Sequence, residues 1–197
     1  GEEVALVGQR AENKFVGVNT GIMDQFVSRL GKKDHALFLD CRLLKYEQLP
    51  LDTSKVKIVA CNTMKPRGLV DSEYDLRRSQ CEEGVKLLSQ WIPNVKALRD
   101  VTSVDLEKYK DRLPEVVYRR ARHVISENER TLKCREVLNA GDFEEFGRLM
   151  NASHDSARDD YEVSCPELEA MVEVGRSAPG ALSCRLAGAG FGGCAVS

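Results

Sequence analysis

The fold class is decided by one stretch of sequence, LSCRLAGAGFGGCAV at residues 182–196. Its glycines match G-x-G-x-x-G, a fingerprint that binds dinucleotides only where a strand precedes the glycines and a helix follows them. Here Leu182–Ala187 predicts a strand before the loop, but Cys194–Val196 predicts a second strand after it. The pattern therefore favours a tight turn between two strands with close backbone approach, and disfavours a Rossmann site. The glycines of this turn are Gly188, Gly190, Gly192 and Gly193.

The rest of the chain alternates between helical and strand patterns. Pro50 to Ser54 separates two predicted strands and marks a predicted domain boundary, so that residues 1–54 and 55–197 form two domains of an α+β protein. Gly31 is expected to end a helix in a left-handed conformation, and Ser103 to cap one. The predicted helices are 2–15, 24–30, 72–91, 104–113 and 114–139, one that begins after Asp142 and one that begins after Ser164; the other predicted strands are 36–41, 44–49 and 56–61.

Composition excludes several classes of function. The 29 Lys and Arg residues are balanced by 31 Asp and Glu residues, so the net charge of −2 gives no footprint for nucleic acid. Apolar runs stay well short of the roughly 20 residues that a membrane span needs, so no membrane partner is expected. The seven cysteines are odd in number and contain no C-x-x-C pair, which indicates reduced thiols and predicts a cytoplasmic protein.

Two carboxylates flank a glycine-containing loop and could carry chemistry. Asp24 follows Gly21 near a helix start, where the unpaired N–H groups stabilise an anion, and spacing alone favours a plain helix cap over an acceptor for a substrate hydroxyl. Glu12 precedes the same loop and could hold a hard cation such as Mg²⁺, although spacing alone favours a solvated helix residue. His154 lies in a polar stretch that favours a solvated or helix-pairing face over a metal cluster or a His-Asp pair. The arginines near His123 allow either phosphate contacts or helical ion pairs.

Seven blocks of sequence, which run almost from end to end of the chain, are informative in their order. They are AENKFVG (11–17), GIMDQF (21–26), HALFLDCR (35–42), DSEYDLRRSQCEE (71–83), RARHVISEN (120–128), HDSARDDYEVSCPEL (154–168) and GAGFGGC (188–194). Taken in this order, the blocks resemble the galactokinases, a family of the GHMP small-molecule kinases.

The resemblance implies a fold and an activity. Residues 1–54 would end an N-terminal α/β domain, and residues 55–197 would form most of a ferredoxin-like C-terminal domain. The family transfers a phosphoryl group from MgATP to the C1 hydroxyl of α-D-galactose, giving galactose 1-phosphate. Two alternatives stay open within the same fold, an N-acetylgalactosamine kinase and a non-catalytic transcriptional regulator that binds galactose and ATP.

The resemblance also assigns roles to single residues. Asp24 matches the aspartate thought to accept or orient the proton of the C1 hydroxyl, and Glu12 matches the glutamate that holds Mg²⁺. Gly21 matches a backbone contact to the sugar, Tyr74 matches a tyrosine that contacts a sugar hydroxyl, and the glycine turn matches a motif beside the active site. One departure is visible, because Leu186-Ala187 stands where relatives usually carry Met-Thr.

The ends of the chain lead to a further expectation. A helical pattern is already under way at Glu2, and a strand pattern is just starting at Cys194, so the chain is expected to be an internal piece of a longer protein. The family's N-terminal signature and its ATP phosphate loop would then lie before Gly1. By itself the chain is expected not to turn over, since phosphoryl transfer depends on that positioning apparatus.

Overall fold

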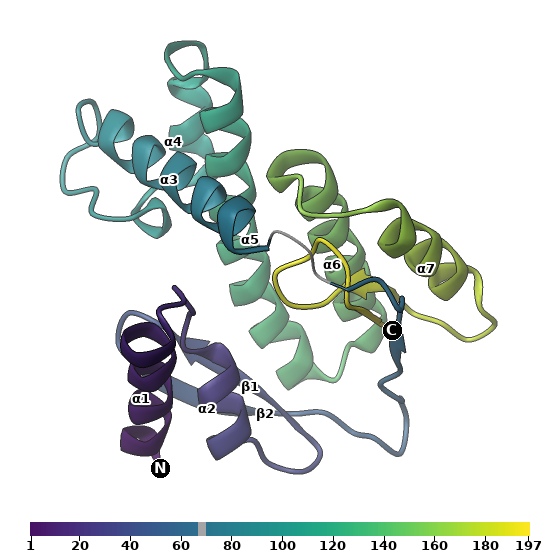
Figure 1. The fold of residues 1–197 in the computed structure, drawn as a ribbon. Coiled ribbons are helices and arrows are strands. Elements are labelled where there is room, and N and C mark those ends of the chain that lie inside the picture. The colour runs from purple at the N-terminus through teal and green to yellow at the C-terminus, as the bar shows by residue number, and fades with distance from the viewer. Residues whose placement is uncertain (67–69) are drawn as a thin grey trace. The chain divides into compact units, whose positions relative to one another are not determined.

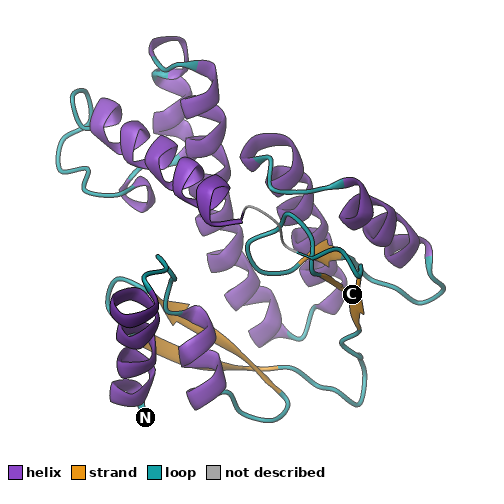
Figure 2. Ribbon diagram, in the orientation of Figure 1, coloured by secondary structure: helices purple, strands orange, loops and turns teal. Residues whose placement is uncertain are grey.

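The computed structural model describes residues 1–66 and 70–197 and divides them into two compact units. Unit 1 comprises Gly1–Lys57 and Arg135–Phe143, and unit 2 comprises Ile58–Cys134 and Glu144–Ser197. Figure 2 shows that helices and strands occur in both. The mixed composition confirms the predicted α+β class.

Unit 1 packs two helices against a β-hairpin. Helix α1 (Glu2–Ala11) continues as a π turn (Glu12–Val16) and is followed by α2 (Met23–Leu30). Strands β1 (His35–Asp40) and β2 (Lys45–Pro50) pair antiparallel, from His35 opposite Pro50 to Asp40 opposite Lys45 (Figure 1). The buried residues of the small core are Ala5, Ile22 and Phe26, against which leucines of the hairpin pack.

The end of α2 differs from the sequence-based prediction. Gly31 does follow the helix, but its φ of −56° is not left-handed. A Cβ at Gly31 would lie 2.6 Å from the Val27 carbonyl oxygen, so the glycine is required by close backbone approach. Its N–H donates to that same carbonyl at 2.9 Å, which closes the last turn.

Unit 2 combines a helical core with a three-stranded sheet. Its helices are α3 (Val70–Leu88), α4 (Ser103–Lys108), α5 (Glu115–Ala140, grouped with unit 1 from Arg135), α6 (Phe143–Ser156) and α7 (Pro166–Ser177). The sheet has the order β3 (Ala60–Asn62), β5 (Cys194–Val196) and β4 (Arg185–Leu186), and both pairs are antiparallel. Residues of α3, α4, α5 and the 3-10 turn Leu98–Asp100 form one buried cluster, which contains Leu88, Leu98, Leu106, Val117, Ala121 and Ile125.

Several predicted boundaries in unit 2 shift in the structure. The strand predicted over 56–61 is confined to Ala60–Asn62, and Ile58 is 62% exposed, so the β-branched run does not lie in a covered sheet. Thr102, and not Ser103, caps α4, because its side chain accepts the Asp105 N–H. Cys165 precedes α7 without a capping side-chain hydrogen bond, and Ser164 donates to Glu169 instead. Within the part of the chain that is described, no helix is long and apolar enough to cross a membrane.

Candidate functional site

The two predicted carboxylates of unit 1 line one open pocket of about 360 Å³. Glu12 comes from the start of the π turn and Asp24 from the first turn of α2. Figure 1 shows these two segments beside each other at the α1–α2 pair. The lining residues are Val4, Ala5, Gly8, Glu12, Asp24, Gln25, Ser28 and Arg29.

Asp24 is not the N-cap of its helix. Ile22 occupies that position, and Asp24 lies exposed in the first turn, where the helix dipole favours a negative charge. The plain helix-cap interpretation is therefore wrong for this residue. A solvent-facing carboxylate at a helix N-terminus can accept a proton or a hydrogen bond from a hydroxyl of a ligand.

Glu12 is held by a neighbour in α2. The Gln25 Nε2 donates to its Oε1 at 2.9 Å, which fixes the carboxylate at the pocket wall. The loop that follows is ordered by Asn13, whose Oδ1 accepts both the N–H of Thr20 at 3.0 Å and its hydroxyl at 2.9 Å. Gly17, at a φ of +86°, ends the π turn and donates to the Glu12 carbonyl.

The donors in this pocket suit a hard cation in part. Carboxylate oxygens are the ligands that Mg²⁺ prefers, and it commonly takes one or two of them from the protein. Among residues 1–66 and 70–197 no cluster of three or more His, Cys, Asp or Glu side chains could hold a metal ion. A cation held here by Glu12 would therefore need further ligands from water, substrate or another part of the protein.

The two remaining predicted sugar contacts have different settings. Gly21 is exposed, and a Cβ there would meet no atom within 4 Å, so the surroundings of Gly21 place no steric demand on it. Tyr74 lies in α3 of unit 2 and is 37% exposed. The structure brings Glu12 and Asp24 together within unit 1, and Tyr74 belongs to the other unit.

The glycine turn joins β4 to β5. Gly188, Gly190, Gly192 and Gly193 have φ values of 71°, 83°, 133° and 80°, in the region that favours glycine. A Cβ on Gly190 would lie 2.1 Å from the Val163 carbonyl oxygen, and one on Gly192 would lie 2.7 Å from that of Lys65. A strand follows the turn, as Cys194–Val196 predicted, so the turn lacks the helix that a dinucleotide site needs.

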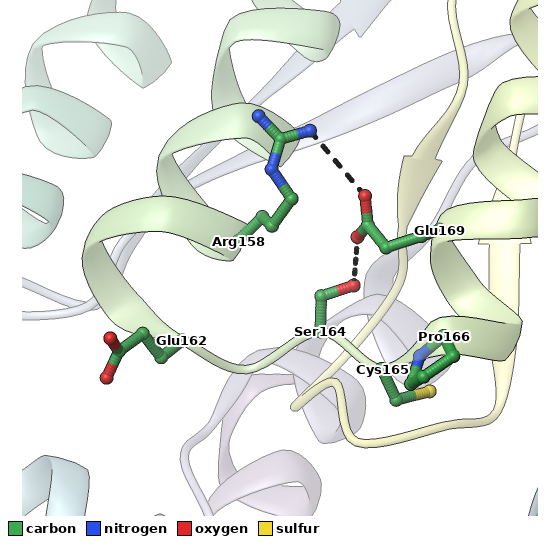
Figure 3. Close-up of a pocket in the computed structure, with 6 residues that line it drawn as sticks. All are labelled: Arg158, Glu162, Ser164, Cys165, Pro166 and Glu169. Carbon is green, nitrogen blue, oxygen red and sulfur yellow. Dashed lines mark hydrogen bonds and ion pairs between the residues drawn. The ribbon is translucent and has the colours of Figure 1, made fainter.

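A second pocket, of about 330 Å³, lies in unit 2. Figure 3 shows Glu169 between Arg158 and Ser164. The Glu169 carboxylate lies 3.5 Å from the Arg158 Nη1 and accepts a hydrogen bond from the Ser164 hydroxyl. The residues that line this pocket are Arg158, Glu162, Ser164, Cys165, Pro166 and Glu169. Arg158 and Glu169 are thus engaged with each other, and the pocket is a weaker candidate than the carboxylate pair of unit 1.

His154 contradicts the expectation of a solvated helix face. The side chain is fully buried, its Nδ1 accepts the Leu186 N–H at 3.2 Å, and its Nε2 lies 3.2 Å from the Glu169 Oε1. Burial lowers the pKa of His154, so the neutral ring is favoured and its proton lies on Nε2. The histidine links α6 to β4 and has a structural role.

Arginines of α5 bind the segment 157–162, which sequence reasoning missed. Arg119 and Arg120 pair with Glu162, and Arg122 pairs with Asp160. The two guanidiniums beside Glu162, that of Arg120 first, hold the pKa of its carboxyl below the ordinary value. For these three arginines the alternative of ion pairs along one helix is wrong, because their carboxylate partners lie about 40 residues away in sequence. The arginines at 119–122 and the acidic residues at 159–162 were visible in the sequence, but their separation along the chain gave no sign that they pair.

Comparison with known proteins first gives the class. Residues 134–197 match the family model described as GHMP kinases C terminal. This segment contains α6, α7 and the glycine turn. The match shows that this segment resembles the C-terminal part of the GHMP kinases.

Two curated relatives and one solved structure that resemble this chain are galactokinases. The galactokinase of Roseiflexus sp. (strain RS-1) is 50% identical over 197 residues, which is all of this chain and 50% of that protein. The galactokinase of Fusobacterium nucleatum subsp. nucleatum is 49% identical over 99% of this chain and 50% of its own length. The crystal structure of Lactococcus lactis galactokinase complexed with galactose matches 98% of this chain and 50% of that one, at a TM-score of 0.92 and 39% identity.

These findings confirm the resemblance to galactokinases and the fold. The chain spans about half the length of the curated relatives it matches. The activity of the whole protein is therefore inferred below.

Proposed function

We propose that this chain is the C-terminal portion of a galactokinase, which transfers the γ-phosphoryl group of ATP to the C1 hydroxyl of α-D-galactose. The observation that carries the proposal is the pocket of unit 1, where Glu12 and Asp24 from two separate sequence blocks meet. Similarity of about 50% to galactokinases over the whole chain supports the same activity. In domain terms, residues 1–54 would end the N-terminal domain and residues 55–197 would form most of the C-terminal one.

The residues present would divide the chemistry as follows. Asp24 would accept or orient the proton of the C1 hydroxyl. The C1 oxygen would then bond to the γ-phosphorus while the bond from that phosphorus to the leaving ADP oxygen breaks. Gly21 would contact the sugar through its backbone, and Tyr74 would hydrogen-bond a sugar hydroxyl. Glu12 would hold Mg²⁺, which when bound supplies neutralisation of phosphate charge.

The proposal also implies a cellular compartment and a position for the ATP phosphate loop. All seven cysteines are free of disulfides, which supports the reducing cytoplasm as its compartment. The ATP phosphate loop would lie in the half of the relatives' length that this chain does not span.

The test uses the full-length protein encoded by the same gene, assayed for ATP-dependent formation of galactose 1-phosphate. Turnover of galactose well above that of N-acetylgalactosamine is expected. Preferred turnover of N-acetylgalactosamine would replace the substrate. Binding of galactose and ATP without turnover would instead indicate a regulator of the same fold.

The 197-residue chain by itself provides a second measurement. It is expected to bind neither MgATP nor galactose in calorimetry, because Glu12 alone is too little to hold the metal. Exposed apolar side chains on unit 1, among them Phe15 at 92% and Val16 at 65%, should make it associate on a sizing column. A monomer that binds ATP tightly would place the nucleotide site within these residues and overturn the assignment of the phosphate loop.

A further inference from the structure

Arg77 has an unusual setting for an arginine on a helix. Its side chain is only 9% exposed. The Nε donates to the Tyr161 carbonyl oxygen at 2.7 Å, and the Nη2 donates to the Glu162 carbonyl oxygen at 2.9 Å. The Nη1 donates to the Glu73 carboxylate at 3.2 Å, so all three nitrogens of the guanidinium make a hydrogen bond.

The two carbonyls belong to the end of a helical segment. The π turn Ala157–Tyr161 ends at Glu162, whose φ of 55° turns the chain out of the helix. Carbonyls at a helix end lack partners within the helix and attract a positive charge. A planar guanidinium can donate to two adjacent oxygens at once, whereas a lysine ammonium cannot reproduce that fork.

Val163, the residue that follows Glu162, contacts the glycine turn. The Val163 carbonyl oxygen accepts the Phe191 N–H at 2.7 Å, and Gly190 leaves no room for a side chain against it. The Arg77 guanidinium also lies 5.9 Å from the centre of the Phe191 ring. Arg77 therefore touches both the end of the π turn and the glycine turn.

Tyr74 is in the same part of α3. It precedes Arg77 by three residues, so the two side chains emerge from the same face of the helix. Tyr74 follows Glu73, the carboxylate partner of Arg77, directly. Tyr74 is 37% exposed, whereas Arg77 is buried. The same face of α3 is therefore held in place by Arg77 and leaves part of Tyr74 accessible to a ligand.

We propose that Arg77 is a positioning residue, which fixes the turn of α3 that bears Tyr74 to residues 161–163 and to the glycine turn. The Tyr74 hydroxyl then meets the sugar from a set position. This inference rests on the proposed function, in which Tyr74 contacts a sugar hydroxyl. It adds to that function a residue that acts through Tyr74 and does not itself touch the sugar.

Arg78 provides a matched control on the next position of the helix. Its side chain is 56% exposed and pairs with Glu82 one turn further on. An exposed ion pair of this kind contributes little to stability or to position. Arg78→Lys should therefore leave the kinetics of the full-length protein unchanged.

The test is a double-mutant cycle in the full-length protein. Arg77→Lys should raise KM for galactose by about fivefold, while KM for ATP changes less than about twofold. Tyr74→Phe should then add less than about twofold to KM for galactose in the Arg77→Lys protein, but show its full effect in the Arg78→Lys protein. Equal effects of Tyr74→Phe in both backgrounds, or an equal rise of both KM values, would overturn the proposal.

A measurement on the unmodified protein covers the case in which Arg77→Lys does not fold. Galactose should slow amide hydrogen exchange of residues 73–78 and of the Phe191 amide together. Protection of residues 73–78 with no change at Phe191 would overturn the proposal. Absence of galactokinase activity in the unmodified protein would instead count against the proposed function, which keeps the two failures apart.

Discussion

Unit 1 and unit 2 hold their candidate functional residues in different ways. In unit 1, Asp24 lies exposed at an open pocket, and Glu12 is fixed by one hydrogen bond from Gln25. In unit 2, buried Arg77 and Arg120 bind main-chain carbonyls and carboxylates of the segment 160–162. Exposed groups remain able to meet a ligand, whereas buried ion pairs need their partners to offset desolvation.

The difference separates two kinds of substitution. Changes at the unit 1 pocket should alter chemistry with little loss of folding, because few contacts depend on those side chains. Changes at the contacts of Arg77 and Arg120 in unit 2 should lower the free energy of unfolding, because the loss of either partner leaves a buried polar group without a hydrogen bond. The expected effects below run from the largest to the smallest.

The glycine turn of unit 2 should be the most sensitive position. Gly190→Ala places a Cβ 2.1 Å from the Val163 carbonyl oxygen at a φ of +83°, so strain and overpacking should together cost about 3 kcal/mol or more of unfolding free energy. Gly180 has nearly the same φ of +81° but open space around it, so Gly180→Ala should cost about 1 kcal/mol. Urea unfolding of both variants measures the difference. Equal losses would mean that φ alone, and not the approach to Val163, makes the turn sensitive.

Asp24 should affect chemistry without affecting folding. Asp24→Asn keeps the shape but removes the charge and the basicity, so kcat of the full-length protein should fall by roughly 10²-fold or more, with KM for galactose changed much less. Glu3 is another exposed acid in the first turn of a unit 1 helix, and Glu3→Gln should leave kcat unchanged. A near-normal kcat for Asp24→Asn would remove this residue from the reaction.

His123 should make the stability of unit 2 depend on pH. Its ring stacks on Tyr161 and its Nδ1 lies 2.9 Å from the Ser156 hydroxyl. Burial is the main cause that lowers the pKa of His123 from 6.5 to about 4; the Glu127 carboxylate raises this pKa and the Arg130 guanidinium lowers it further. Between pH 6.5 and pH 4, His123 is protonated in the unfolded chain but neutral in the folded chain. The free energy of unfolding therefore falls as the pH falls from 6.5 towards 4.

His123→Phe keeps the stacked ring and removes this titration. The loss of unfolding free energy between pH 7 and pH 5 should become smaller by about 2 kcal/mol. Ser156→Ala is the control, because it removes the hydrogen-bond partner and leaves the buried, titratable ring in place. Chemical unfolding at the two pH values gives the comparison, and an unchanged loss in His123→Phe would contradict it.

Tyr74 should show the smallest effect. Tyr74→Phe removes one hydroxyl and leaves the ring, and loss of a sugar hydrogen bond worth about 0.5–1.5 kcal/mol should raise KM for galactose by about two- to twelvefold. Tyr46 of β2 has a similar exposure, 39% against 37%, and Tyr46→Phe should leave KM unchanged. If the two variants behave alike, Tyr74 does not contact the sugar.

Sequence patterns predicted the elements better than their ends. The helix from Pro114 to about Asn139 corresponds to α5 (Glu115–Ala140), because a long periodic apolar stripe and the stop at Gly141 are local signals. The strand over 56–61 was predicted from β-branched residues, yet only Ala60–Asn62 pairs with β5. Strand length depends on a partner that is distant in sequence, and Val59 gains one only through its two backbone hydrogen bonds with Ser197.

Within the candidate site, the residues were predicted from the sequence, but the structure was needed to show which of them lie close together. The resemblance placed roles on Glu12 and Asp24, while their common pocket required the packing of α1 against α2. Tyr74 and the glycines were named from sequence as well. The carbonyl contacts of Arg77 could not be predicted, because every residue has a main-chain carbonyl and the residue type does not show which one accepts a hydrogen bond.

By itself, the sequence determined the class of the fold, the strand after the glycine turn and the resemblance to galactokinases, since these depend on local periodicity and on blocks of adjacent residues. Only the tertiary structure decided that His154 is buried, that Gly31 serves close approach instead of a left-handed cap, and that Arg77 binds Tyr161 and Glu162. The physical reason is the same in each case. Burial, close backbone approach and hydrogen bonds to carbonyls are relations between segments far apart in the chain, and they exist only once those segments have packed together.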